Sequence, residues 1–90
     1  MARMGMDVDL VETAGKKLQT YAHQLETLVT QMNGVVSSLP GVWEGKDSND
    51  FVQQWWPQHK KNLLAAKEAV NGLGQAALNN ARDQRDVSGR

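Results

Sequence analysis

Apolar residues recur every seven positions through the first half of the chain. Two rows follow this spacing, and Ala22, Val29 and Val36 widen them. The first row is Met4, Val11, Leu18, Leu25, Met32 and Leu39, and the second row is Ala14, Tyr21, Leu28, Val35 and Val42. A sustained heptad pattern is typical of a long helix that packs against other long helices. We therefore predict a first helix over about residues 9–38.

Polar residues mark the start and the outer side of this helix. Asp7 or Asp9 is suited to the N-cap position, and Asp9 with Glu12 resembles a capping box. The side opposite the two apolar rows is expected to face water. It carries Lys16, Gln19, Gln24, Glu26, Gln31 and Asn33.

Helix breakers occupy the middle of the chain and predict a turn over residues 39–47. Pro40 has no backbone donor, and Gly41 adopts unusual dihedral angles freely. Asp47 and Ser48 are the expected N-caps of the returning helix, because their side-chain oxygens accept hydrogen bonds from first-turn amides. Gly45 is expected to be the turn residue that needs a positive φ.

Trp43 is the residue of this turn that turn chemistry does not require. A large apolar ring in a short polar turn either packs against other residues or is presented to a partner. Two interpretations follow: the ring closes the end of a helical bundle, or it forms part of a recognised surface.

A second helix is predicted over about residues 48–82. Its apolar row advances by steps of four and three through Val52, Trp56, His59, Leu63, Ala66, Val70, Leu73 and Ala77. Pro57 is expected to kink this helix about one turn back. Gly72 and Gly74 either permit a close helix approach or add flexibility. Residues 83–90 are polar and lose the period, which predicts a disordered tail.

Phe51, Trp55 and Trp56 form a predicted aromatic cluster at the start of the second helix. Neighbouring residues on a helix point about 100° apart, so the two tryptophans cannot share one groove. We expect Trp56 to point inward and Trp55 to pack toward Trp43.

These elements predict one all-α domain over residues 1–90, an antiparallel helix-turn-helix hairpin. Two amphipathic helices cannot bury all of their apolar surface against each other. Dimerisation into a four-helix bundle is therefore expected. The predicted dimer interface is Val11, Leu18, Leu25, Leu28, Met32, Val35, Leu63 and Val70.

Composition removes several functional classes. Ten basic and ten acidic residues give zero net charge, which argues against nucleic-acid binding. No apolar run is long enough to span a bilayer, no cysteine is present, and no secretory signal pattern is found. His23 and His59 lack further ligands at metal-site spacing. We expect no metal, no cofactor and no catalytic activity.

The central residues carry a resemblance to a known family. Trp43-Glu44-Gly45, at the turn of a cysteine-free hairpin, resembles the WXG hairpin proteins, the small substrates of type VII secretion in Gram-positive bacteria. Phe51 and Trp55 are similar to the longer actinobacterial form of the motif. The resemblance implies homodimeric or heterodimeric four-helix bundles, exported folded by an ATPase-driven machine without a cleaved signal peptide. It implies a cytoplasmic stage before release to the medium or the cell surface.

One part of the family pattern is missing. Many family dimers carry a Tyr-Xaa-Xaa-Xaa-Asp/Glu motif just after the second helix in at least one chain, and residues 81–90 contain no tyrosine. The implied partner is a second copy of this chain or a WXG-type protein that brings the motif. Two alternatives to secretion stay open: a membrane-active amphipathic hairpin and an intracellular coiled-coil adaptor.

Overall fold

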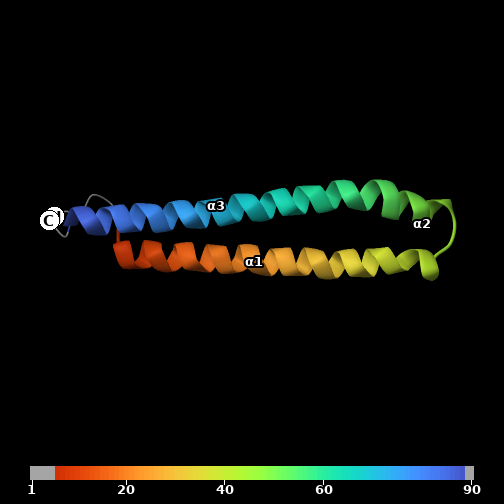
Figure 1. The fold of residues 1–90 in the computed structure, drawn as a ribbon, viewed down its shortest axis with the longest axis horizontal. Coiled ribbons are helices and arrows are strands. Elements are labelled where there is room, and N and C mark those ends of the chain that lie inside the picture. Colours follow the sequence, from red (N-terminus) through yellow and green to blue (C-terminus); the bar gives the residue numbers. More distant parts are fainter. Residues whose placement is uncertain (1–5, 89–90) are drawn as a thin grey trace.

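Two long antiparallel helices joined by a short turn make up the protein (Figure 1). The computed structural model describes residues 6–88. Its elements are α1 (Val8–Ser38), a 3-10 turn (Leu39–Gly41), α2 (Lys46–Asp50), a π-helical turn (Phe51–Trp55) and α3 (Trp56–Ser88). The hairpin measures 66 × 16 × 15 Å. The predicted all-α hairpin is confirmed, and no helix among the described residues is both long and apolar enough to cross a membrane.

The first helix begins at Val8, slightly earlier than predicted, with Asp7 as its N-cap residue. The carboxylate of Asp7 accepts a hydrogen bond from the backbone N–H of Leu10 at 3.1 Å. Asp9 and Glu12 do not form the capping box that their spacing suggested. Both carboxylates instead bind Arg85 of α3, at 2.7 Å and 3.2 Å. The start of α1 is thereby fastened to the end of α3.

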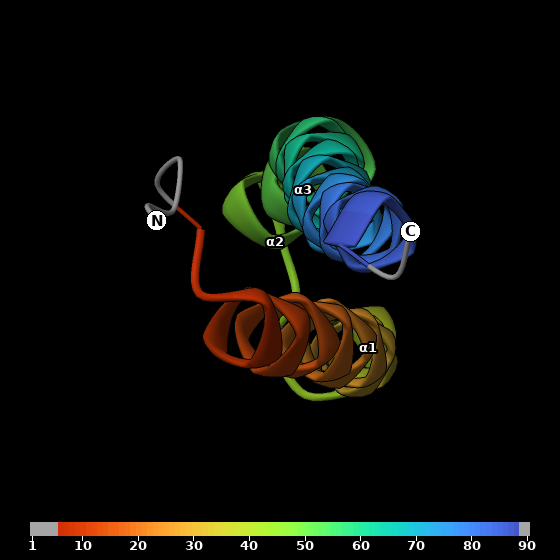
Figure 2. The same cartoon turned by 90° about the vertical axis from the view of Figure 1, so that its left-hand side faces the viewer.

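The core of the hairpin is one buried row of α1 packed on α3. Gly15, Ala22, Val29 and Val36 are buried at heptad spacing, and Val29 is only 1% exposed. The buried residues of α3 are Trp56, Gly74 and Ala81. Viewed end on, the two long helices form a single layer (Figure 2). Each long helix therefore has one covered side.

Two glycines allow the helices to approach closely. A Cβ atom on Gly74 would lie 2.8 Å from the carbonyl oxygen of Gly15, and a Cβ on Gly15 would lie 2.9 Å from the carbonyl oxygen of Gly74. Both distances are shorter than real Cβ contacts. A Cβ on Gly72 would meet nothing within 4 Å. Of the two predicted small positions, only Gly74 is required by packing.

The second helical segment starts earlier than predicted. α2 begins at Lys46 with Gly45 as its N-cap residue, and no side-chain cap hydrogen bond forms. Asp47 and Ser48, the predicted caps, lie inside the first turn. The physical reason is the backbone of Gly45, whose φ of 115° turns the chain directly into the helix. The predicted positive φ at Gly45 is confirmed.

The second helical segment also ends later than predicted. α3 continues to Ser88, so the expected disorder is wrong for residues 83–88. The contacts of Arg85 with Asp9 and Glu12 hold this last part against α1. Residues 89–90, the remainder of the predicted tail, and Met4 of the first apolar row lie outside the described residues.

Pro57 is accommodated by a π turn. The helix runs without interruption from Lys46 to Ser88, and the backbone N–H of Trp56 donates to the carbonyl of Phe51, five residues earlier. Pro57 itself has no N–H to donate. The distortion expected one turn before Pro57 is therefore a wider helical turn.

Candidate functional site

The turn that carries Trp43 is built by backbone hydrogen bonds. The N–H groups of Val42 and Trp43 both donate to the carbonyl oxygen of Leu39, at 2.9 Å and 2.7 Å. The N–H of Asn49 donates to the carbonyl oxygen of Gly45 at 3.2 Å and starts the return helix. Trp43 is thus held on a short defined loop between the end of α1 and the start of α2.

Four rings follow one another from the turn along the second helical segment. Trp43 is 41% exposed and leans on Phe51, with 6.0 Å between ring centroids and 52° between ring planes. Phe51 stacks on Trp55 at 4.7 Å, and Trp55 stacks on His59 at 3.8 Å. We call Trp43, Phe51, Trp55 and His59 the aromatic ladder. Trp55 is joined to Trp43 through Phe51 and not by direct stacking.

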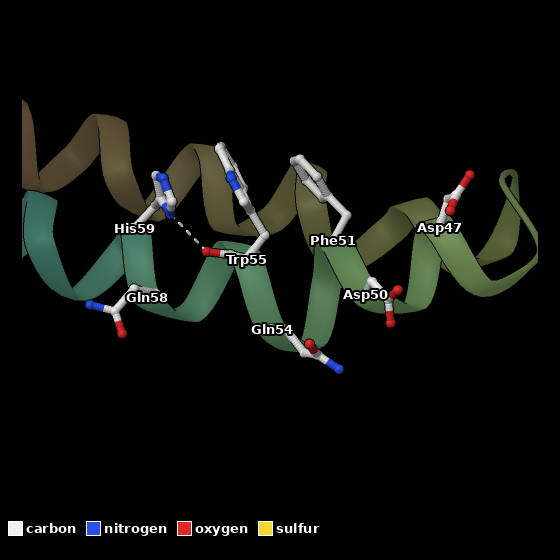
Figure 3. A pocket seen from close by; sticks show the side chains of 7 residues that line it. All are labelled: Asp47, Asp50, Phe51, Gln54, Trp55, Gln58 and His59. Atoms are coloured by element: carbon white, nitrogen blue, oxygen red, sulfur yellow. Dashed lines mark hydrogen bonds between the residues drawn. The ribbon is translucent and has the colours of Figure 1, made fainter.

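The rings of the aromatic ladder on the second helical segment lie on one side of the helix, and neighbouring glutamines lie on the other. Figure 3 shows the rings of Phe51, Trp55 and His59 projecting together, with Gln54 and Gln58 on the opposite side of the helix. Nδ1 of His59 donates to the carbonyl oxygen of Trp55 at 2.9 Å, which leaves Nε2 directed away from that bond. Because Trp55 stacks between Phe51 and His59, both of its faces are covered and its edge is offered to a partner.

Trp56 separates from the predicted aromatic cluster. Its side chain is 5% exposed and lies between the helices, as expected for the inward tryptophan. The indole Nε1 donates to Oδ1 of Asn33 at 2.9 Å. A buried indole N–H needs such a partner, since an unpaired donor costs about 1–3 kcal/mol. The cluster is therefore divided between a buried anchor and the exposed ladder, which His59 joins.

Two hollows flank the ladder. The first is lined by Asp47, Asp50, Phe51, Gln54, Trp55, Gln58 and His59. The second lies between the helices and is lined by Met32, Val36, Phe51, Trp55, Trp56, His59, Asn62 and Leu63. Within residues 6–88, no group of three or more His, Cys, Asp or Glu side chains could hold a metal ion. The largely apolar second hollow suits side chains of another helix.

The second hollow belongs to a longer apolar side of the hairpin. Residues that share this side are exposed and follow heptad spacing on both helices. They are Ala14, Tyr21, Leu28 and Val35 on α1, and Trp55, Ala66, Ala69, Leu73 and Ala76 on the returning helix. We call this surface the apolar face. Leu28 is 50% exposed and Val35 is 65% exposed, which is high for large apolar side chains.

The predicted interface residues divide between this face and the contact within the hairpin. Leu28 and Val35 lie on the apolar face, and Met32 is exposed beside it in the second hollow. The other five predicted residues are half-buried where α1 and α3 meet: Val11, Leu18, Leu25, Leu63 and Val70. Tyr21 and Leu73 are exposed members of the face that the predicted set omits.

The opposite side of the hairpin is polar. From the sequence pattern, most of its α1 residues were expected to face water. Glu12, Gln19, Glu26 and Asn33 of α1 each contact a residue of α3, and we call this heptad row with its partners the polar edge. Gln19 Nε2 donates to Gln75 Oε1 at 3.0 Å, and Lys67 Nζ lies 3.3 Å from Glu26 Oε2. Glu12 meets Arg85, and Asn33 meets Trp56. The seven-residue spacing of these four α1 residues is the feature of the sequence that could have predicted their contacts with α3.

Two cations hold the polar edge electrostatically. The pKa of Lys67 is raised above its ordinary 10.5, first by a hydrogen bond with Glu68 and then by Glu26, while desolvation opposes this. The stabilisation from Lys67 is fully present below the unfolded value and is lost as the pH rises through the raised folded value. Glu12 and, secondarily, Asp9 raise the pKa of Arg85. Both cations are charged at neutral pH.

Comparison with known proteins gives a family for this hairpin. The sequence model of the WXG100 family, described as proteins of 100 residues with WXG, matches residues 3–87. No curated protein and no solved structure matches the chain. The matched segment includes nearly all of both long helices and the Trp43-Glu44-Gly45 turn. The chain therefore belongs to the WXG100 family of small helical-hairpin proteins.

Proposed function

We propose that this chain is a noncatalytic secreted protein or partner protein of type VII secretion that works as a dimeric helical bundle. WXG100 proteins are small non-catalytic helical proteins, commonly type VII substrates, and they generally form dimers. The observation that carries the proposal is the apolar face, where Tyr21, Leu28 and Val35 remain at least half exposed in the single hairpin. A contiguous apolar surface of this kind marks an interaction site.

The size of the hairpin supports a dimer. The hairpin is 66 Å long and 16 Å wide. One long side of it therefore has enough area for the roughly 800 Å² per partner that a standard stable interface buries. A chain of only 90 residues also buries a small hydrophobic core when it folds as a single copy, so association adds to its stability. Zero net charge means that two copies have no long-range repulsion. The proposed partner is a second copy, with a WXG-type protein that carries the tyrosine motif as the alternative.

The proposed contact centres on Leu28 and Val35. Around them, Met32 and the half-buried Val11, Leu18, Leu25, Leu63 and Val70 would lose their remaining exposure when a second hairpin covers the face. This arrangement would place two hairpin layers back to back as a four-helix bundle.

The mass of the purified protein in solution tests the dimer. We expect size-exclusion chromatography with light scattering to give twice the chain mass of 10.0 kDa. We also expect cooperative thermal unfolding whose midpoint rises with protein concentration, because the folded state is linked to association. A stable helical monomer at every concentration would contradict the proposal.

Trp43 is the proposed recognition residue for export. Its ring is partly exposed at the turn, packs on Phe51, and is the first ring of the aromatic ladder. Aromatic anchors of this kind contribute about 2 kcal/mol or more at recognition surfaces. In the proposed route the protein is cytoplasmic until export and then reaches the medium or the cell surface.

Replacing Trp43 by alanine should reduce export at least about tenfold, since a loss of about 1.4 kcal/mol weakens binding tenfold. The measurement is the secreted fraction in a Gram-positive host with an active type VII system, with a tyrosine-motif partner co-expressed. Val42→Ala, which changes an exposed neighbour, is the matched control and should be secreted normally. Equal export of a folded Trp43→Ala protein would remove the recognition role. Retention of the wild type inside the cells would contradict export itself.

A further inference from the structure

The apolar face and the polar edge of the hairpin lie on different sides and suit different neighbours. On α1, the polar edge lies three residues before each buried position, as Glu26 precedes Val29. The row of Leu18 and Leu25 lies four residues before buried positions, and Leu28 lies one residue before Val29. With 3.6 residues per turn, a step back of three turns about 60° to one side of the buried row, whereas steps back of four and of one turn about 40° and 100° to the other side. The apolar face and the polar edge are therefore opposite sides of one layer.

The polar edge is made by contacts within the hairpin. Among the described residues, every side-chain hydrogen bond or ion pair that joins α1 to α3 involves Asp9 or one member of the row Glu12, Gln19, Glu26 and Asn33. These contacts recur along the whole length of α1. The side chain of Lys67 is 16% exposed and that of its partner Glu26 is 49% exposed, so the pair is formed within the hairpin and still reaches water.

We infer that the polar edge restricts this chain to one docking face and ends its assembly at two hairpins. The inference rests on the proposed dimer and says what limits it. A hairpin that is apolar on both sides presents two docking faces, and successive copies then add without closing. A third hairpin placed on the polar edge would remove water from the Glu26–Lys67 and Glu12–Arg85 pairs without providing new partners. Desolvating paired charges in this way opposes association.

The occupant of the apolar face is a second copy of this chain. Each copy then turns its polar edge outward, and the finished bundle has polar edges on both outer sides. Such a contact is isologous: the same surface is used by both copies, so it is complete after one pairing.

An edge variant tests the inference. Gln19→Leu, Glu26→Leu, Lys67→Leu and Gln75→Leu replace two facing polar pairs by apolar pairs and leave the net charge unchanged. We expect light scattering to give masses above two chains that grow with protein concentration. The matched control is Lys17→Leu, Thr27→Leu, Gln58→Leu and Asp86→Leu, which adds four leucines to exposed positions on the outer rows of the two helices and also preserves net charge. Circular dichroism checks that both variants are helical.

The outcomes separate the two proposals. The wild-type mass alone reports on the dimer. The difference between the edge variant and the control reports on the polar edge. Larger assemblies for the edge variant than for both the wild type and the control support the inference. An edge variant with the wild-type mass at every concentration overturns it, and so does a control that assembles as far as the edge variant.

Discussion

Replacing Gly74 with alanine should lower the free energy of unfolding by up to about 2 kcal/mol, because forcing extra volume into a packed contact costs about 1–3 kcal/mol and alanine regains about 1 kcal/mol over glycine in a helix. The new Cβ would lie 2.8 Å from the carbonyl oxygen of Gly15 and 2.8 Å from Cγ of Gln19. The glutamine side chain can move, but the backbone carbonyl can yield only if the helices separate. Urea unfolding followed by circular dichroism measures the change.

Gly72→Ala is the matched control for this prediction. It makes the same substitution on the same helix, two residues away, where nothing lies within 4 Å of the new Cβ. Alanine is favoured over glycine in a helix by about 1 kcal/mol, so this variant should be more stable than the wild type. Equal stabilisation by both substitutions would show that the helices do not approach closely at Gly15 and Gly74.

Replacing Leu28 with aspartate should convert the proposed dimer into folded monomers. Leu28 is half exposed in the single hairpin, so the charge can remain in water there, whereas the dimer would bury it without a partner. Loss of a central interface side chain costs about 2 kcal/mol or more, which weakens association at least about 30-fold. Light scattering over a dilution series gives the mass, and circular dichroism reports the remaining helix.

Thr27→Asp provides the comparison. It introduces the same charge on the neighbouring exposed residue, which points about 100° away from Leu28 around the helix. This variant should keep the wild-type mass. If Leu28→Asp also keeps the wild-type mass while remaining helical, the apolar face is not the dimer contact.

The sequence predicted the hairpin and the position of its turn because heptad spacing and helix breakers act locally. It did not distinguish the rows that face α3 from those that face a partner. Leu28 and Val29 illustrate the difficulty, because both are apolar and both fit the pattern, yet Leu28 is half exposed while Val29 is buried. Which of the two rows is buried depends on how α1 is rotated about its axis relative to α3. The sequence of one helix does not contain this information.

The long-range polar contacts were not predictable for a related reason. Glu26 and Lys67 come from different helices, and their meeting depends on the length of the turn and on the π turn before Pro57. The same applies to Arg85. The local sequence around Arg85 is polar and predicts a frayed helix end. In the folded chain Asp9 and Glu12 lie beside Arg85 and pair with it.

The rod shape has a consequence for transport through confined space. The Cα radius of gyration is 19.9 Å, whereas a compact globule of this length would have one of about 12 Å and a diameter of about 30 Å. Seen end on, the hairpin is only 16 × 15 Å. An aperture that stops a sphere of the same mass can admit this rod lengthwise with every helix intact, so its orientation rather than its unfolding would determine passage.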